Sequence, residues 1–491
     1  MRPVHLAVFL AIGAPIAALA DEPAARPEAT SPDPQPAAKP DLRAAPPAGD
    51  PESNPAPPTN RTLAWLEVPG VNLTLNIGGR VMKPQEDSYD FTWETWKTNL
   101  KGGWEYDPNS YRTNQYAHPY EGSLFMTSCR SLGLQFWEGF GCTFVGSFIW
   151  ETLMEIHPPS INDQITTTIA GSYLGEVLYR VATDILDSGP EGSAWHELAA
   201  AAVAPMNGFN RLFYSDKFHD RRMRGFTSST DFGVAVGVAG QATDAGDTQQ
   251  FDAGNVRLML RTTHGLPTED GWRFRRPFDH YYLSTSLNID RNSFTNSSGV
   301  NLLIYGLLIG GSYGEGVNSG LWGVFGAYDV ITAAQLRAST SAFAFGTVKQ
   351  WSLSPSTRLL GTGYLGAGFG AAGTSAIVED KRDYHFGAQA IAYLDLKLLW
   401  SNRLRVRASA REYVTGDQLS PDQGGYEDLT YALGEVSFRI LGGHALGVEA
   451  LGGRRKAHYP DVPSVDQRFR QLSVMYEYVT DPSMGSGRLI E

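Results

Sequence analysis

Residues 385–416 read HFGAQAIAYLDLKLLWSNRLRVRASAREYVTG, and this stretch decides the fold class. In its first half one face carries Phe386, Ala388, Ala390, Ala392, Leu394, Leu396, Leu398 and Trp400, and the other shares His385, Gln389, Asp395 and Lys397. In its second half Leu404, Val406, Ala408 and Ala410 alternate with Arg403, Arg405, Arg407, Ser409 and Arg411. A period of two is typical of β-strands, so the stretch predicts two successive strands.

The same alternation recurs throughout the C-terminal half of the chain. Twelve candidate strands lie near 230–242, 253–263, 278–291, 299–312, 320–330, 335–350, 357–371, 384–400, 402–416, 428–442, 443–455 and 467–480. A soluble β-sandwich also alternates, but its outer face is richly charged on every strand. Here many polar faces are Gly, Ala, Ser and Thr, which favours an outer-membrane barrel with an even number of strands. A soluble all-β domain is the alternative.

Aromatic residues gather near the ends of the candidate strands. They are Tyr281, Tyr282, Trp322, Trp351, Trp400, Tyr413, Tyr476 and Tyr478. In a membrane barrel such residues form girdles at the two interfaces with water, so we expect them on the outside.

Composition excludes several other classes of protein. The 491 residues include 52 acidic and 40 basic side chains, for a formal charge of -12, and no block of Lys or Arg suggests nucleic-acid binding. Only 19% of residues are charged, against about 25% in an average soluble domain. After the first 20 positions no apolar run is long enough for a membrane-spanning helix. Two cysteines are too few for a disulfide-built small domain.

The N-terminal 60 residues predict two processing or linking segments. Residues 1–20 combine Arg2, an apolar run from Leu6 to Leu19 and small residues at Ala18 and Ala20, which is typical of a cleavable signal peptide. Residues 21–60 hold 12 of the 29 prolines and only one large apolar residue, Leu42. They predict a disordered tether, which is most simply a solvated spacer; the alternative is a segment that reaches across the periplasm or contacts the cell wall.

Residues 61–224 have helix-length stretches and the most distinctive motifs. The motifs are His118-Pro119-x-x-Gly122-Ser123, Gly146-Ser147-x-x-Trp150-Glu151, Pro158-Pro159-Ser160-x-Asn162-Asp163 and Gly175-Glu176-x-x-Tyr179-Arg180. Over most of residues 65–215 the chain resembles a domain of unknown function from Gram-negative envelope proteins, in which a helical segment is joined to a predicted outer-membrane barrel. The resemblance implies this architecture and no particular activity.

Three helices are expected around these motifs, from about 118 to 132, from about 135 to 156, and from Ser160 onward. Ser160 and Asp163 match a capping-box variant at the start of the third helix. Gly171 and Gly175 leave room for another helix to approach closely. Glu151 and Glu155 have i,i+4 spacing, which places both carboxylates on one helix face.

These helices carry the candidate catalytic residues, namely His118, Glu151, Glu155, Asp163 and Glu176. If they converge, an imidazole with several carboxylates could activate water for hydrolysis. Their spacing matches no metal motif. The alternative is a packing network, in which Asp163 caps its helix, Glu176 pairs with Arg180, Glu151 or Glu155 pairs with Arg130, and His118 bonds a backbone carbonyl.

Two further features allow alternative interpretations. Cys129 and Cys142 fall on successive predicted helices, so they form either a disulfide or two buried thiols. The arginines at 403, 405, 407 and 411 line an anion channel or pair with lumen acids such as Asp395.

The sequence therefore predicts an α+β protein, with an N-terminal helical domain at 61–224 followed by an antiparallel transmembrane β-barrel of about 12 strands at 225–491. We expect it in the bacterial outer membrane, with the helical domain periplasmic or inside the barrel. There the helical domain plugs or gates the barrel or binds a partner, and the alternative is an enzyme acting on envelope lipid or glycan. Expected partners are outer-membrane lipid, the barrel-assembly machinery and a periplasmic or cell-wall component reached by the tether, without nucleic acid. The sequence does not identify a cofactor or a metal.

Overall fold

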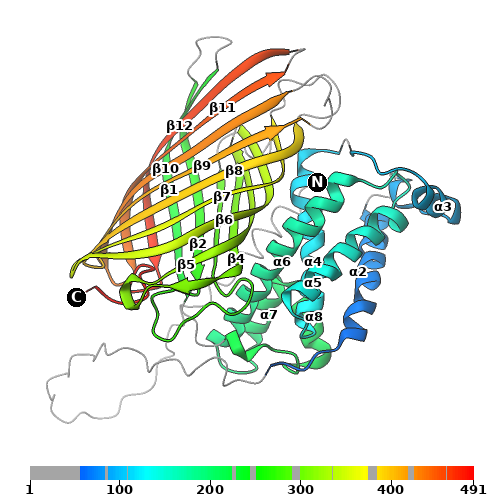
Figure 1. Ribbon diagram of the computed structural model, residues 1–491, viewed down its shortest axis with the longest axis horizontal. Helices are drawn as coiled ribbons and strands as arrows, with labels where there is room; N and C mark the ends of the chain where they lie inside the picture. The colour runs from blue at the N-terminus through cyan, green and yellow to red at the C-terminus, as the bar shows by residue number, and fades with distance from the viewer. Residues whose placement is uncertain are drawn as a thin grey trace, which may run out of the picture.

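The computed structural model describes residues 56–82, 87–107, 109–223, 228–243, 250–289, 299–333, 336–373, 384–417, 425–459 and 462–490. Two units lie side by side, a helical unit (residues 61–223) and a β-barrel (residues 228–479), as Figure 1 shows. The predicted signal peptide and nearly all of the tether lie outside the described residues.

Twelve antiparallel strands close into a barrel, in which each strand pairs with its neighbours in sequence and β1 pairs with β12. The strands are β1 (Ser228–Thr243), β2 (Gln250–His264), β3 (Tyr281–Ile289), β4 (Gly299–Tyr313), β5 (Gly320–Ala333), β6 (Leu336–Ser354), β7 (Thr357–Gly373), β8 (His385–Trp400), β9 (Leu404–Gly416), β10 (Tyr426–Leu441), β11 (His444–Tyr459) and β12 (Val462–Val479). With seven α-helices before it in the described chain, this barrel confirms the predicted fold class.

The connections at the end where the chain enters and leaves the barrel include very short turns. Residues 355–356 join β6 to β7, and residues 442–443 join β10 to β11. In the turn between β8 and β9, Ser401 and Asn402 have φ angles of 49° and 51°. Two successive residues with positive φ match the twist of antiparallel strands, so the turn fixes the register of this hairpin.

Strand β12 illustrates how the two faces of the barrel differ. Its outward residues Leu472 and Val474 are 56% and 64% exposed, whereas the inward Ser473 and Glu477 are buried. Charged outward residues such as Arg468 lie in the other half of the strand, away from the chain termini. The outer surface is therefore apolar near the terminal end of the strand and charged toward the opposite end.

The aromatic residues divide between the two faces of the barrel. Trp322, Trp351, Trp400, Tyr476 and Tyr478 are between 40% and 52% exposed and lie near the terminal end. The expectation that the remaining tyrosines also lie on the outside is wrong. Tyr282 and Tyr413 point into the lumen, where each contacts an arginine or a carboxylate, and Tyr281 is buried beneath the helical unit.

Seven helices form the helical unit, with α6 at its centre. They are α2 (Arg61–Met82), α3 (Trp93–Lys101), α4 (His118–Ser131), α5 (Phe136–Ile149), α6 (Ile161–Ser188), α7 (Ala194–Val203) and α8 (Pro205–Tyr214). Residues Thr113–Ala117 and Trp150–Met154 form π-helical turns next to α4 and α5. None of the helices within the described residues has the length and apolar character needed to cross a membrane.

Helices α4 and α6 pack backbone to backbone because glycines face each other. A Cβ atom added to Gly171 would lie 2.6 Å from the Cα of Gly122, and one added to Gly122 would lie 2.1 Å from the carbonyl oxygen of Thr167. A Cβ on Gly175 would overlap Met126. The predicted close approach at Gly171 and Gly175 is confirmed.

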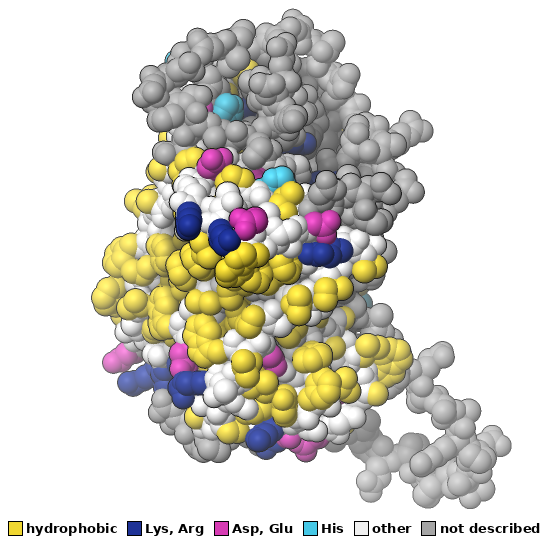
Figure 2. Space-filling model, turned by 90° about the vertical axis from the view of Figure 1, so that its right-hand side faces the viewer, with side chains coloured by type: hydrophobic (Ala, Val, Ile, Leu, Met, Phe, Trp, Pro, Cys, Tyr) yellow, Lys and Arg dark blue, Asp and Glu magenta, His cyan; other side chains and the backbone are white. Residues whose placement is uncertain are grey.

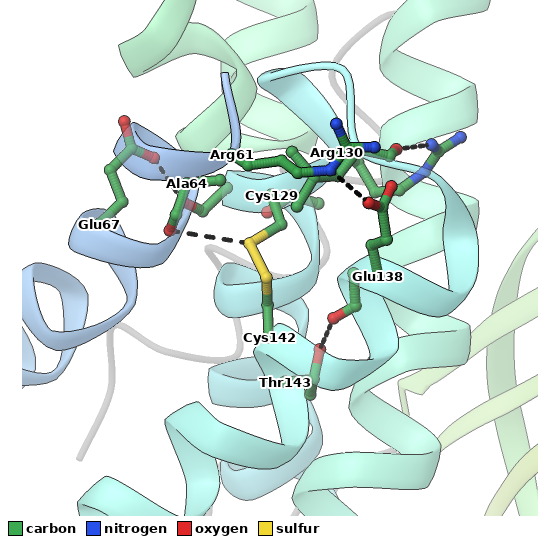
Figure 3. Close-up of a disulfide and its surroundings, with 12 residues drawn as sticks. Arg61, Ala64, Glu67, Cys129, Arg130, Glu138, Cys142 and Thr143 are labelled. Atoms are coloured by element: carbon green, nitrogen blue, oxygen red, sulfur yellow. Dashed lines mark hydrogen bonds and ion pairs between the residues drawn. A yellow bond between two sulfur atoms is a disulfide. The ribbon is translucent and has the colours of Figure 1, made fainter. Parts of the chain in front are cut away.

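A disulfide between Cys129 and Cys142 ties α4 to α5, with the two Cα atoms 6.7 Å apart (Figure 3). Of the two alternatives that the sequence allows, the structure has the disulfide. The bond lies in the apolar core that α4 and α5 share with Ala64 and Val68 of α2. It therefore links the helices that form the outer half of the helical unit.

The helical unit packs against the outer wall of the barrel, meaning the outward side chains of β3 to β8. Tyr173 of α6 contacts Phe278 and Phe343, and a Cβ on Gly326 of β5 would overlap its ring. Outward residues Leu302 and Ile304 of β4 join the same apolar core. The prediction that this unit fills the lumen is therefore wrong, because the lumen is occupied by the barrel's own side chains. Nor does the unit sit at the mouth, since it lies alongside the strands (Figure 1).

Candidate functional site

His118 is the first residue of α4 and is held between two carboxylates. Its Nδ1 lies 3.4 Å from Oε2 of Glu121, one turn along α4, and its Nε2 lies 3.6 Å from Oδ2 of Asp163 on α6. All three residues are buried. The expected bond from His118 to a backbone carbonyl is not what the structure shows, because both ring nitrogens face acids.

The start of α6 positions the acids around His118. Ser160 is the N-cap, and its hydroxyl accepts a hydrogen bond from the Asp163 backbone amide at 3.2 Å. The Ser160 backbone amide does not bond the Asp163 carboxylate, so the expected capping box is incomplete. Instead the Asp163 carboxylate accepts from Asn162 at 2.9 Å, and the Ser160 amide donates to Glu151 at 2.9 Å. The cap therefore brings Glu151, from the π-helical turn after α5, next to Asp163.

Glu155 ends the π-helical turn that follows α5. Its Oε1 accepts a hydrogen bond from the indole nitrogen of Trp150 at 2.8 Å. Unlike Glu151, which is 2% exposed, Glu155 keeps partial contact with solvent. Burial raises the pKa of Glu155 to about 7; the charge of His118 opposes this rise, and Asp163 and Glu121 add to it. Glu155 is thus a carboxyl group that can exchange a proton near neutral pH.

The remaining groups of this cluster titrate abnormally for the same reasons. Burial lowers the pKa of His118, but the charges of Asp163, Glu121 and Glu151 outweigh that effect and raise the pKa well above its usual value. Burial raises the pKa of Asp163 to about 6, although the charge of His118 opposes the shift. Burial and repulsion from Asp163 and Glu155 raise the pKa of Glu151. Four carboxylates therefore share one imidazolium.

We call His118, Glu121, Glu151, Glu155 and Asp163 the His118 cluster. Because both nitrogens of His118 face carboxylates, its role is to hold positive charge rather than to take a proton from a substrate. Glu155 is the member placed to act as a general base. Among the described residues, no group of three or more His, Cys, Asp or Glu side chains has the geometry to hold a metal ion.

Glu176 belongs to a different network. Its carboxylate accepts from Arg130 of α4 at 2.6 Å and from Arg180 at 2.7 Å, and Arg180 also faces Asp279 of the β2–β3 connection at 3.4 Å. The expected Glu176–Arg180 pair is confirmed, but the expected pairing of Arg130 with Glu151 or Glu155 is wrong. Although burial raises the pKa of Glu176, the two arginines outweigh it and the pKa is lowered. This network joins the helical unit to the barrel.

Inside the barrel, buried arginines pair with carboxylates that also point into the lumen. Arg405 of β9 contacts Asp231, Glu435 and Glu477 at 2.6, 2.9 and 2.6 Å. Further ion pairs are Arg261–Glu435 at 2.7 Å, Arg407–Asp395 at 2.6 Å, Arg411–Asp329 at 3.0 Å and Arg455–Glu427 at 2.6 Å. Of the two alternatives for the arginine stripe, pairing with lumen acids such as Asp395 is confirmed for Arg405, Arg407 and Arg411.

Several of these contacts join opposite walls of the barrel. Arg411 on β9 reaches Asp329 on β5, Arg261 on β2 reaches Glu435 on β10, and the rings of Tyr305 on β4 and Tyr393 on β8 are 5.6 Å apart. A cavity of about 60 Å³ remains near the terminal end, small beside the roughly 300–1,000 Å³ of typical ligand pockets. Side chains therefore cross the lumen at several levels.

Sequence reasoning missed two sets of these residues. Glu121 was absent from the candidate site, although its i,i+3 spacing from His118 predicts a shared helix face. The lumen acids Glu435, Glu449 and Glu477 were also missed. The sequence signal for these acids was a charged residue at a strand position that the alternation assigns to the inward face, because a buried charge needs a partner in the lumen.

One comparison with known proteins bears on the helical unit. A family model described as a domain of unknown function (DUF3943) matches residues 103–206, which include the whole His118 cluster. This match supports the resemblance to an uncharacterised family, over a shorter range than the sequence motifs suggested. No curated protein matches the chain significantly.

Solved structures that resemble this chain are barrels. They include the toluene transporter TodX of Pseudomonas putida (11% identity, 51% of this chain and 89% of that chain, TM-score 0.22) and the outer membrane protease OmpT of Escherichia coli (8%, 52% and 98%, TM-score 0.19). A third is OmpF of Salmonella typhi in complex with daunomycin (10%, 52% and 97%, TM-score 0.20). Likeness at this level says nothing about the activity or the ligand of the present chain.

Proposed function

We propose that this chain is an integral outer-membrane protein whose barrel is closed to diffusion and serves to hold the helical unit against its outer wall. The observation that carries the proposal is the division of the barrel into two chemically distinct faces. Exposed outward residues such as Val448 and Val474 are apolar, and buried inward residues are ion-paired arginines and carboxylates. An apolar outside with a polar inside is the pattern of a barrel in lipid, and the reverse of a soluble one.

The charged side chains on the outside of the barrel also support a position of the barrel in a bilayer. Arg454, Asp466 and Arg468 pair with one another on the outside of β11 and β12, beyond the apolar residues of the same strands. At the other end the exposed Trp400 and Tyr478 provide one interfacial girdle. The apolar band thus lies between an aromatic edge and a charged edge, and its partner is outer-membrane lipid.

A closed lumen distinguishes this proposal from a pore. Purified full-length protein in planar lipid bilayers should show no stable conductance steps. Substituting Arg411→Ala together with Asp329→Ala removes one cross-lumen pair without leaving an unpaired charge, so we expect it to produce measurable conductance. The matched control is Arg454→Ala with Asp466→Ala, which removes a pair outside the barrel. Stable conductance by the unaltered protein would overturn the proposal.

A second candidate function is an enzyme, a hydrolase or transferase acting on envelope lipid or glycan. The observation in its favour is the convergence of the His118 cluster, in which Glu155 combines a pKa of about 7 with partial access to solvent. Glu155 would take a proton from water or a hydroxyl group, while His118 keeps the neighbouring carboxylates charged. Glu176 has no part in this chemistry because it is neutralised by Arg130 and Arg180.

Lipid and glycan extracts from cells that produce the protein test this candidate. We expect a change in extract composition that Glu155→Gln abolishes and that the exposed-site control Glu94→Gln preserves, with both variants folded. His118→Gln should weaken the change as well, since it leaves the acids without their cation. If the unaltered protein changes neither extract, the enzymatic candidate fails and the closed-barrel proposal stands.

A further inference from the structure

We infer that the helical unit is immersed in the bilayer beside the barrel, with the outer face of α2 and α5 in contact with lipid acyl chains. This inference rests on the proposed outer-membrane location of the barrel. It assigns one occupant, lipid, to a large apolar surface that the fold leaves uncovered. We call that surface the α2–α5 face, formed by Trp65, Leu66, Leu73, Ile77, Trp137, Phe144 and Phe148, which are between 39% and 64% exposed.

The α2–α5 face carries no exposed charge between its two ends. On α2 the only ionisable residue between Arg61 and Arg80 is Glu67, which is half-buried and whose carboxylate accepts hydrogen bonds from Ser128 and Asn210. On α5 the only one is Glu138, in the first turn. Soluble helices keep polar side chains on the face that meets water, so an uncharged outer face is unusual for them.

Ion pairs mark both ends of this face. Arg61 pairs with Glu138 at 2.7 Å at one end, and Arg80 pairs with Asp90 at 3.0 Å at the other. The two arginines are 19 residues apart on one helix, which corresponds to about 28 Å at about 1.5 Å per residue. The hydrocarbon core of a bilayer is about 30 Å thick. The uncharged stretch therefore has the length of a membrane interior.

The distribution of charge over the whole face agrees with this dimension. Figure 2, which views the helical unit from the side away from the barrel, shows hydrophobic side chains across the middle and charged side chains mainly in bands above and below. Helix α3 lies at one end and combines Trp93, 65% exposed, with Glu94 and Lys97. An aromatic and charged short helix is typical of a membrane interface.

The position of the unit makes lipid the occupant that fits best. It stands along the strands, against the same outer wall whose uncovered part carries Val436, Val448 and Val474. A unit attached to the lipid-facing side of a barrel meets lipid on its own free side unless another protein covers it. Lipid also explains why apolar exposure continues from the barrel onto the helices.

Spin labels at single introduced cysteines test the inference in full-length protein reconstituted into phosphatidylcholine and phosphatidylglycerol vesicles. The native cysteines are joined in the disulfide and do not react with the label. Leu73→Cys reports on the α2–α5 face, Leu472→Cys on the barrel surface and Glu94→Cys on the charged edge. We expect oxygen to relax the labels at 73 and 472 several-fold more effectively, relative to a water-soluble nickel complex, than the label at 94.

Each other outcome overturns a defined part of the argument. If nickel relaxes the label at 73 as strongly as the label at 94 while the label at 472 remains in lipid, the helices are not immersed. The proposal of a membrane barrel then still holds. Labels at 73 and 472 that are both relaxed by nickel overturn the proposed function as well. A label at 73 shielded from both reagents and broadened by a second label shows that another copy of the chain, and not lipid, covers the face.

Discussion

The barrel lumen and the His118 cluster both bury many charged side chains, but they balance the charges differently. In the lumen Arg405 has three carboxylate partners, and two of them, Glu435 and Glu477, also pair with Arg261. In the His118 cluster four carboxylates surround a single histidine. A balanced network keeps all its groups ionised, whereas an acid-rich one must hold some of its carboxyl groups protonated.

This difference separates structural charges from candidate chemical ones. Complete pairing fixes how the walls of the barrel face each other and leaves no group free to exchange a proton. Incomplete pairing leaves Glu155 with a pKa of about 7 and partial solvent contact. The comparison predicts opposite responses of the two regions to the same kinds of substitution.

The largest effect should follow from removing a lumen cation. Arg405→Ala removes a buried cation that pairs with Asp231, Glu435 and Glu477, and breaking a buried ion pair costs about 3–5 kcal/mol. Urea titration measures the loss in stability. The folded fraction is read on gels from the band of folded protein, which disappears when the sample is heated. The exposed pair offers the control, since Arg468→Ala should cost about 1 kcal/mol or less. Equal losses for both variants would mean that the lumen network does not stabilise the barrel.

Removing the disulfide should destabilise the helical unit selectively. Cys129→Ser with Cys142→Ser opens a short loop, for which the expected loss is about 3 kcal/mol. Hydrogen exchange should therefore speed up in α4 and α5 while strands β9 to β12 remain protected. Reduction of the unaltered protein should reproduce the effect. Uniform loss of protection in both units would show that they unfold as one.

Raising the pH should weaken the helical unit. Glu155 and Asp163 have folded pKa values of about 7 and about 6, above their usual values, and the pKa of His118 is also raised. In this window the folded state binds more protons than the unfolded state, so the unfolding free energy falls as pH rises from 5 to 8. Each unit of pKa difference corresponds to about 1.4 kcal/mol. Exchange rates of α4 and α6 amides at several pH values measure the slope, which Glu155→Gln should reduce.

The smallest effect is the sharpest test of the comparison, because the sign itself should change. At pH 8 Glu155→Gln removes an unbalanced charge and retains an acceptor for Trp150, so it should stabilise the helical unit by about 1 kcal/mol. Glu435→Gln makes the same chemical change in the lumen, where Arg261 and Arg405 each lose one carboxylate partner, and should destabilise the barrel. If both substitutions change stability in the same direction, the two regions do not differ in how their charges are balanced.

The strands could be predicted from the sequence because their signal is local. A period of two, interrupted by turn residues, located all twelve strands without knowledge of any distant contact. The position of the helical unit could not be predicted in this way. Leu302 and Ile304, which contact helices, alternate along β4 just as Val474 and Tyr476, which are exposed, alternate along β12. An outward apolar side chain does not indicate whether lipid or a helix covers it.

The candidate site shows the same limit. Glu121 could be assigned to His118 from helical spacing, whereas Asp163 lies on another helix and joins the cluster only through tertiary packing. The sequence places three acidic residues where they could pair with Arg130. Its pairing with Glu176 depends on how closely α4 approaches α6 at Gly122 and Gly171. Local patterns identified the ionisable residues but not their partners.

The docking of α6 on the middle strands also imposes an order on biogenesis. Residues 161–188 emerge from the ribosome before β4 and β5, so Tyr173, Leu174 and Val177 exist for a time without the wall that later buries them. During that interval the chain presents two apolar surfaces at once, the one that will meet the barrel and the α2–α5 face. A newly made chain with so much uncovered apolar surface is prone to aggregate in water. We therefore expect its delivery to need chaperones that shield both surfaces until the β1–β12 seam closes.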